Sequence, residues 1–576
     1  MKTEPVQLFT PSGERLNTDT ERIPWDAYPR PCLRRDSFLN LNGWWDFTVT
    51  ADGESAPEEY DQTIRVPYCP ESLLSGIGEV PPANSRLWYR RHFFLPSGFR
   101  KDRVLLHIGA ADQNTWVYLN GRFVGEHRGG YDPITLDITD YLEDENTLHI
   151  QVTDHLDDAV FPYGKQKHKR GGMWYTPVSG IWQTVWLESV PAQYVRALTV
   201  SVEDGCATIC AEGVSDGVVT ITTPEGRIMV PMQDGVARVE LQQPRLWCPD
   251  DPYLYEYTVE FGDDTVQSYF AVRTLDIRHI NGIPRMCLNG KPVFFHAVLD
   301  QGYWSDGLFT PPEPTCYAWD IQKMQALGFN TLRKHIKIEA EQFYYDCDRL
   351  GMLVWQDMVN NGRYSFIRDT ALPTIGMKKR SDKRLHRDKE TRQAFVDGME
   401  RTVRLLKEHP CVVGWTIFNE GWGQFDSDTM YCLLRQMDTT RFIDTASGWF
   451  KGAQSDVISE HVYFKPYRHH RGDKPVFLSE FGGYSYKPQG HVYNTSKTYG
   501  YRLFEDAEAY MDAVESLYKQ EIIPAVEKGL CGAVYTQLSD VEDETNGLYS
   551  YDRRVCKVDA VRMRDVAAQL TIQTEE

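Results

Sequence analysis

Two glutamates stand where long apolar runs of the sequence come to an end. The run 412–418 leads into Asn419 and Glu420, and the run 476–478 leads through a serine to Glu480. Glycine follows each glutamate within two positions, as is typical of a buried strand that stops and turns. A single strand-end glutamate is usually an ordinary surface residue, but a pair in this setting indicates two carboxylates held for chemistry.

Cleavage of a glycosidic bond needs two carboxyl groups with different roles. One protonates the departing oxygen, and the other attacks the sugar carbon or stabilises its developing positive charge. Glu420 and Glu480 are the candidates for these two roles, and a separation of about 5–5.5 Å between their carboxyl groups would make the enzyme a retaining glycoside hydrolase. Asn419, beside Glu420, is expected to bind a sugar hydroxyl next to the reacting carbon.

The elements that must position these carboxylates are predicted to form a parallel β/α barrel. From residue 276 onward, apolar strand-like runs alternate with amphipathic segments such as 388–408 and 505–528. Eight strands in about 300 residues match a TIM barrel, whose catalytic groups lie at the carboxyl ends of the strands. The two glutamates then end strands four and seven, roughly across the barrel mouth from each other. The predicted strands are 293–299, 331–335, 353–358, 412–419, 442–447, 458–463, 475–480 and 532–537.

The chain before the barrel is predicted to form two β-sandwiches. Residues 1–190 hold many short strands, and Asn120-Gly121 between two of them is a strong hairpin signal. Residues 191–275 continue as short strands and have the size of an immunoglobulin-like domain. The predicted fold class is therefore a multidomain chain with an N-terminal jelly-roll β-sandwich, an immunoglobulin-like β-sandwich and a C-terminal (β/α)8 TIM barrel at 276–576.

The segment 161–176 carries glycines and basic residues inside the strand-rich first domain. Either it reaches over the barrel mouth and helps to shape the pocket, or it is a plain surface loop. The sequence leaves both alternatives open.

Composition excludes several classes of partner. The net charge of −20, from 62 basic and 82 acidic residues, disfavours nucleic acid and anionic membranes. No run of about 18 apolar residues occurs, so no membrane span is expected.

The 12 cysteines form no C-x-x-C pair and no clustered ligand set, so we expect reduced thiols, no metal and no cofactor. The N-terminus shows no signal-like apolar run, which makes a cytoplasmic location the expectation. Aromatic residues, at 12%, suit a carbohydrate partner because sugar faces pack on flat rings.

Several motifs make the sequence resemble glycoside hydrolase family 2, the group that contains β-galactosidases and β-glucuronidases. The resemblance covers nearly the whole chain, and the motifs are specific when taken together. It implies an N-terminal sugar-binding domain and a catalytic barrel of a retaining enzyme, in which Glu420 is the general acid/base and Glu480 is the nucleophile. The segments that carry the resemblance are 37–47, 124–131, 179–182, 288–292, 418–420 and 479–482.

The resemblance implies roles for further strand-end residues. Arg333 matches the strand-two arginine that supports the nucleophile, and Asp357 matches an acidic position after strand three. For these two, a buried ion pair that braces the barrel is the alternative. His461 and Tyr463 match the strand-six position where a tyrosine contacts the nucleophile.

At three other predicted substrate-binding positions the resemblance gives less guidance. The family's strand-two arginine is followed three residues later by histidine, whereas His335 comes two residues after Arg333. Asp300 and His335 are candidates on their own terms, as polar groups that end predicted strands one and two. Gln537 follows strand eight where many relatives have tryptophan, and its amide is expected to bind a sugar hydroxyl.

The sugar is predicted less directly than the reaction. The β-glucuronidases bind the sugar carboxylate through an Asn-x-Lys motif after strand eight, and the segment 544–553 lacks that lysine. Lys334, Lys337 or Arg553 remain as other donors for a carboxylate. We therefore predict an exo-acting, β-galactosidase-like enzyme, with a β-uronidase or an arabinosidase as alternatives. A carbohydrate-binding protein that has lost catalysis is the rival from another class. Family analogy alone suggests a homo-oligomer.

Overall fold

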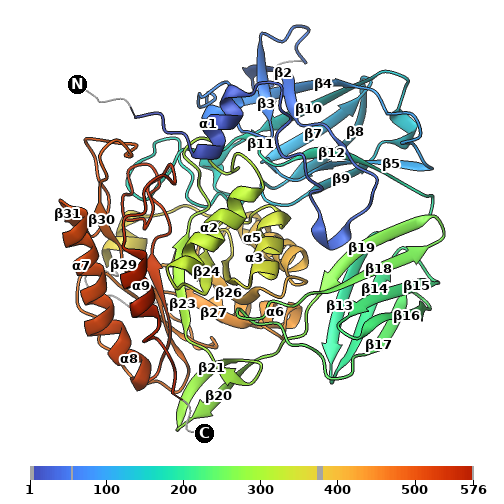
Figure 1. Ribbon diagram of the computed structural model, residues 1–576. Coiled ribbons are helices and arrows are strands. Elements are labelled where there is room, and N and C mark those ends of the chain that lie inside the picture. Colours follow the sequence, from blue (N-terminus) through green and yellow to red (C-terminus); the bar gives the residue numbers. More distant parts are fainter. Residues whose placement is uncertain (1–4, 54–55, 373–380, 574–576) are drawn as a thin grey trace.

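The computed structural model describes residues 5–53, 56–372 and 381–573, and it contains three structural parts in chain order (Figure 1). Two antiparallel β-sandwiches, drawn in blue and green, lie to the right of a barrel drawn in yellow-green to red. Among the described residues, no helix is both long enough and apolar enough to cross a membrane.

The N-terminal part is a jelly-roll sandwich, as predicted. A six-stranded sheet in the order β3-β2-β4-β10-β7-β8 faces a four-stranded sheet in the order β1-β12-β5-β9. Strand residues alternate between buried and partly exposed, so the buried side chains of both sheets form one core. Asn120 and Gly121 have φ of +53° and +76° and join β7 to β8, which confirms the predicted hairpin. The bounds are β1 Leu39–Asn40, β2 Gly43–Ala51, β3 Gln62–Val66, β4 Ser85–Phe93, β5 Arg103–Ile108, β7 Asn114–Leu119, β8 Arg122–Arg128, β9 Ile134–Asp137, β10 Asn146–Thr153 and β12 Val185–Val190.

The second part is the predicted immunoglobulin-like sandwich. A three-stranded sheet, β13-β14-β17, faces a four-stranded sheet, β16-β15-β18-β19, around a core that includes Ile209, Val219 and Val259. The domain boundaries predicted at 190/191 and 275/276 stay predictions. The bounds are β13 Ala197–Glu203, β14 Cys206–Glu212, β15 Gly217–Thr223, β16 Gly226–Met232, β17 Val236–Glu240, β18 Tyr255–Phe261 and β19 Asp264–Phe270.

The third part is a parallel eight-stranded barrel. Its strands are hydrogen-bonded in the order β27-β26-β25-β24-β23-β32-β29-β28. A contact of 3.3 Å between the hydroxyls of Ser447 and Ser459 crosses the remaining seam between β27 and β28. All eight predicted strands are confirmed. The bounds are β23 Phe295–Asp300, β24 Thr331–Lys334, β25 Leu353–Asp357, β26 Val412–Asn419, β27 Phe442–Ser447, β28 Ile458–Val462, β29 Val476–Gly482 and β32 Leu530–Thr536.

Helices and a hairpin complete the barrel. The predicted amphipathic segment 388–408 is α5, and the segment 505–528 forms α7 and α8, joined by a π-helical turn at Tyr518–Ile522. The hairpin of β20 and β21 lies at the lower edge of the barrel in Figure 1. The bounds are α2 Thr315–Ala326, α3 Glu341–Leu350, α5 Lys389–Leu406, α6 Ser427–Met437, α7 Ala507–Leu517, α8 Ile523–Lys528, α9 Ala560–Ala567, β20 Leu275–Ile280 and β21 Ile283–Leu288.

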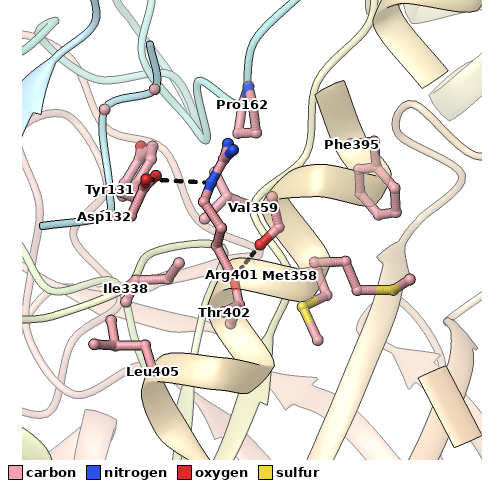
Figure 2. A pocket seen from close by; sticks show the side chains of 14 residues that line it. Tyr131, Asp132, Pro162, Ile338, Met358, Val359, Phe395, Arg401, Thr402 and Leu405 are labelled. Atoms are coloured by element: carbon pink, nitrogen blue, oxygen red, sulfur yellow. Dashed lines mark hydrogen bonds and ion pairs between the residues drawn. The ribbon is translucent and has the colours of Figure 1, made fainter. Parts of the chain in front are cut away.

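Ion pairs fix the sandwiches to each other and to the barrel. Arg35 contacts Glu188 of β12 and, at 2.8 Å, Asp264 of β19, so one guanidinium joins both sandwiches. Figure 2 shows Arg401 of α5 beside Asp132, with 3.2 Å between Nε and Oδ2, at a pocket between the jelly roll and the barrel. These contacts hold the first domain in a defined position against the barrel.

Candidate active site

The two predicted glutamates meet at one imidazole ring. Nδ1 of His461, on β28, lies 2.9 Å from Oε1 of Glu420 and 3.4 Å from Oε2 of Glu480. One carboxylate oxygen of each glutamate and one ring nitrogen of His461 all lie within 4.8 Å of one another. Glu420 follows β26 and Glu480 belongs to β29, so the ends of distant strands bring two carboxylates together.

The backbone at the end of β26 is turned sharply to present Glu420. Its φ is +52°, a left-handed conformation that costs a non-glycine residue about 1–2 kcal/mol. The amide of Glu420 donates to the carbonyl of Ser447 at 2.9 Å, and Trp449 Nε1 donates to the carbonyl of Glu420 at 3.1 Å. These bonds hold the turn in the strained conformation that points the carboxylate into the mouth.

Glu480 receives two hydrogen bonds from strand-end residues. Arg333 Nη1 donates to Oε1 at 3.1 Å, and the hydroxyl of Tyr463 donates to Oε2 at 2.5 Å. Burial raises the pKa of Tyr463 well above its usual value, so the hydroxyl stays protonated as a donor. Arg333 is fully buried and also donates to Asp357 at 3.0 Å and to Asn419 at 2.9 Å. These donors fix the orientation of the Glu480 carboxylate, as a nucleophile requires.

The structure places His335 beside the charge network rather than beside the glutamates. Its Nδ1 lies 2.7 Å from Oδ2 of Asp357, which in turn binds Arg333. Burial, followed by the nearby charge of Lys165, lowers the pKa of His335 to about 4. The imidazole is therefore neutral at pH 7. The sequence left two alternatives for Arg333 and Asp357: a buried ion pair that braces the barrel, or support of Glu480. The structure shows both in one network.

The other two candidate substrate-binding residues are not brought into contact with the glutamates. Asp300 is buried and binds Lys334 Nζ at 2.6 Å. Gln537 accepts a hydrogen bond from Gln301 at 2.7 Å, while its own buried amide nitrogen has no partner among the described residues. Both lie at strand ends as expected, and their roles in binding sugar stay predictions.

The segment 161–176 reaches over the barrel mouth, which decides between the two alternatives that the sequence left open. The amide of Tyr163 donates to the carbonyl of Asn360, which follows β25, at 3.0 Å. The amide of Thr176 donates to Glu542, beyond β32, at 2.9 Å. The first domain therefore forms part of the wall of the site.

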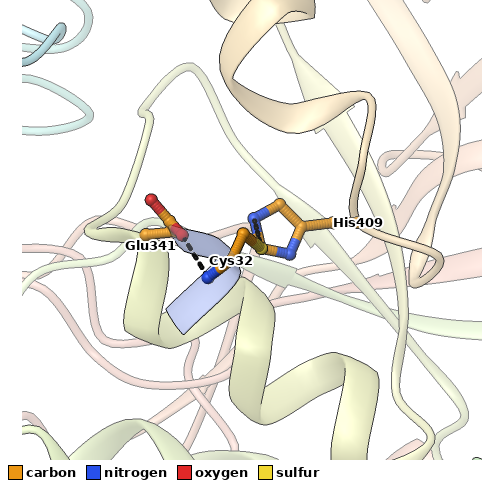
Figure 3. A group of neighbouring side chains, drawn as sticks. All are labelled: Cys32, Glu341 and His409. Atoms are coloured by element: carbon orange, nitrogen blue, oxygen red, sulfur yellow. Dashed lines mark hydrogen bonds between the residues drawn. The ribbon is translucent and has the colours of Figure 1, made fainter. Parts of the chain in front are cut away.

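Two clusters of described residues have side chains of the kind that bind metals. One is the Glu420–His461–Glu480 group itself. The other is Cys32, Glu341 and His409, shown in Figure 3, in which Glu341 begins α3 and His409 precedes the start of β26. There Cys32 Sγ lies 3.9 Å from His409 Nε2, and burial raises the pKa of the thiol well above its usual value. Neither cluster by itself assigns an ion, and the absence of a required metal stays a prediction.

Comparison with family models decides the membership of the chain. Three models match in succession: "Glycosyl hydrolases family 2, sugar binding domain" over 59–191, "Glycosyl hydrolases family 2" over 193–273, and "Glycosyl hydrolases family 2, TIM barrel domain" over 282–490. The chain belongs to glycoside hydrolase family 2. It is therefore a glycoside hydrolase with the sandwich–sandwich–barrel fold described above.

Known proteins with different activities resemble this chain. A β-galactosidase of Thermoanaerobacter pseudethanolicus is 25% identical over 67% of this chain, which spans only 52% of that relative. A β-glucuronidase of Paenibacillus borealis is 24% identical over 72% of this chain and 73% of its own length. The structure of a β-D-glucuronidase of Dictyoglomus thermophilum matches with a TM-score of 0.71 and 17% identity, covering 95% of this chain and 100% of that one. A β-galacturonidase of Eisenbergiella tayi matches with a TM-score of 0.67 and 18% identity, over 96% and 100%.

Sequence reasoning missed side chains that support this family 2 site from outside the strand ends. Tyr501 stacks on Tyr463 with ring centroids 3.7 Å apart, and Trp449 binds the backbone of Glu420. Lys165 lies in the segment over the mouth. Only the basic character of that segment was a signal in the sequence.

Replacing Tyr463 by phenylalanine is expected to lower kcat for an aryl glycoside by about 10–100-fold, since a hydrogen bond to a charged group contributes about 1.5–3 kcal/mol. KM is expected to change much less, because the hydroxyl acts on the nucleophile. Steady-state kinetics would measure both. Tyr467→Phe is the matched control, as its hydroxyl binds His469 at 3.1 Å. An equal effect of the two variants would contradict a specific role of Tyr463.

Proposed function

We propose that this chain is a retaining, exo-acting β-glycosidase in which Glu480 is the nucleophile and Glu420 the general acid/base. The observation that carries the proposal is the convergence of the two carboxylates, with their oxygens around His461 within 4.8 Å. Retaining enzymes have carboxyl groups about 5–5.5 Å apart, whereas inverting enzymes keep them about 6.5–9.5 Å apart to admit a water molecule.

The arrangement supports a double displacement. In the first step Glu480, oriented by Arg333 and Tyr463, attacks the anomeric carbon while Glu420 protonates the departing oxygen. The covalent bond removes the negative charge of Glu480. In the second step Glu420 takes a proton from water, which attacks the same carbon and releases Glu480. Asn419, fixed by Arg333, is positioned beside this centre to bind a sugar hydroxyl.

The predicted sugar, a β-galactoside, rests on the resemblance, and the relatives include β-glucuronidases and a β-galacturonidase as well. The three cations suggested by the sequence for a uronate are already engaged. Lys334 binds Asp300 and Glu339, Lys337 binds Glu339, and Arg553 binds Asp320. A β-uronide is nevertheless the second candidate, because Lys165 and Lys167 of the segment 161–176 contact aromatic rings and form no ion pair with a carboxylate among the described residues. The cytoplasmic location and the homo-oligomer stay predictions.

The test is hydrolysis of a panel of aryl β-glycosides, namely galactoside, glucuronide, galacturonide and arabinoside, followed by proton NMR of the first-formed sugar. We expect turnover of at least one member with the β-anomer formed first. The α-anomer as first product would overturn the retaining mechanism. Silence on every member, with sugar binding intact, would favour the carbohydrate-binding protein.

A further inference from the structure

The stretch 165–167 follows a turn closed by a 3.4 Å hydrogen bond from the amide of Gln166 to the carbonyl of Tyr163, and it holds two lysines near the barrel. Gln166 binds Asp112 through Nε2 at 3.0 Å and accepts from the amide of Val178 at 2.6 Å, so its side chain is anchored in the first domain. The ammonium of Lys165 lies near Trp422 and that of Lys167 near Tyr364, and both of these rings belong to the barrel.

Close backbone contact brings this stretch against the barrel. Gly164 has φ of +66°, and a Cβ at this position would lie 3.0 Å from the carbonyl of Ile336, just beyond β24. Only glycine allows this approach without strain. As a result the next residue, Lys165, enters the site close enough for its charge to act on His335.

Two aromatic rings lie near the Lys165 ammonium, and no carboxylate of the described residues forms an ion pair with it. Its Nζ lies 5.6 Å from the ring centroid of Tyr175 and 5.8 Å from that of Trp422, which is two residues beyond Glu420. Lys165 is only 8% exposed, and its carbonyl accepts a hydrogen bond from the amide of Tyr175, yet its ammonium has no hydrogen bond or ion pair with a described residue. A buried ammonium is costly without an anion, and ring faces offset only part of that cost. The donor is therefore free to bind one.

Lys167 extends the same surface. Its Nζ lies 3.8 Å from the centroid of Trp174 and 4.9 Å from that of Tyr364. The rings of Trp174 and Trp422 are 5.4 Å apart, so one aromatic cluster connects the two lysines. The buried Nε1 of Trp422 has no partner among the described residues and is a further unused donor.

We propose that Lys165, supported by Lys167 and Trp422, forms an anion-binding subsite that selects substrates carrying a carboxylate or sulfate group on the glycan. The subsite comes from the first domain and lies beside the proposed acid/base, so the selected group belongs to the sugar in the pocket or to its immediate neighbour. The proposal rests on the proposed glycosidase function for its kinetic consequence, but the binding itself does not require turnover.

Kinetics on matched nitrophenyl β-glycosides would test the selectivity. The acidic members are the glucuronide, the galacturonide and the galactoside 6-sulfate, and the neutral member is the galactoside. Lys165→Met is expected to lower kcat/KM for the preferred acidic member by about 50-fold, as loss of a charge-assisted hydrogen bond implies. The neutral member is expected to change less than about 3-fold, and Lys165→Arg is expected to restore part of the loss. Lys169→Met, on the exposed part of the same loop, is the control.

A binding experiment tests the subsite independently of the glycosidase function. In the Glu480→Gln protein, calorimetry with galacturonate, glucuronate and galactose 6-sulfate is expected to show tighter binding than with galactose, and Lys165→Met is expected to abolish the difference. The anionic sugar that binds most tightly shows whether the subsite selects a carboxylate or a sulfate group. The subsite would be overturned if the anionic sugars bind no better than galactose. It would also be overturned if Lys165→Met weakens the binding of acidic and neutral sugars equally while the thermal stability is unchanged. If the protein turns over none of the substrates but still binds anionic sugars in a way that depends on Lys165, only the proposed glycosidase function would be overturned.

Discussion

Glu480→Gln is expected to abolish turnover, with kcat reduced by at least about 10⁴-fold, the scale seen when a nucleophile is removed. The amide keeps the shape of the side chain and its neighbours Arg333 and Tyr463 but cannot form the glycosyl ester. Binding of the sugar is expected to persist. The measurement is kcat on the best aryl glycoside of the panel, with the thermal unfolding midpoint of each protein alongside.

Covalent trapping gives the same prediction a second readout. A 2-deoxy-2-fluoro glycosyl fluoride is expected to add one sugar mass to the wild-type protein, on the peptide that contains Glu480, and nothing to the Glu480→Gln variant. The matched control is Glu527→Gln, on the exposed end of α8, which is expected to retain wild-type activity. A label on another carboxylate, or activity above about 1% of wild type in Glu480→Gln, would refute the assignment.

The barrel could be predicted because its strands are buried on both faces. Such strands are continuous apolar runs, and 412–419 and 476–480 are completely buried in the structure. The strand ends therefore identified Glu420 and Glu480 before any contact was known. The sandwich strands alternate instead, and the Asn-Gly turn marked where one hairpin reverses.

Residues around the glutamates were predictable only in part, because a strand end does not reveal which neighbour neutralises a side chain. Arg333 and Tyr463 bind Glu480 as the resemblance implied. Asp300 ends a strand just as they do, yet Lys334 on the adjacent strand takes up its charge. Register between parallel strands, which decides such pairs, is not encoded in the local sequence of either one.

The contribution of the first domain could not be predicted from the sequence. Lys165 reaches Trp422 across 257 positions of the sequence only because the jelly roll docks on the barrel, through contacts such as Arg401–Asp132 and Tyr175–Glu544. Local propensity carries no information about docking between domains. The basic residues of the loop were visible, but their direction was not.

Glu420→Ala is expected to spare the first chemical step for an activated leaving group and to impair it for a poor one. A dinitrophenolate departs without a proton, whereas loss of general acid catalysis costs about 10²–10⁴-fold when the leaving group needs protonation. Kinetics on dinitrophenyl, nitrophenyl and methyl glycosides of the preferred sugar would show a steep dependence of kcat/KM on the leaving group. The isosteric Glu420→Gln variant is expected to show the same dependence. An equal loss on all three glycosides would argue that Glu420 only shapes the pocket.

Azide distinguishes the two glutamates directly, because each alanine variant opens a space on a different face of the sugar. In Glu420→Ala, azide is expected to attack the glycosyl ester on Glu480 from the face opposite that ester, which raises turnover and gives a β-glycosyl azide. In Glu480→Ala, azide enters from the nucleophile's side and the product is the α-glycosyl azide. Proton NMR of the anomeric signals reads both results. If the two anomers appear in the reverse variants, the roles of Glu420 and Glu480 must be exchanged, since each variant then opens the face that the other was expected to open.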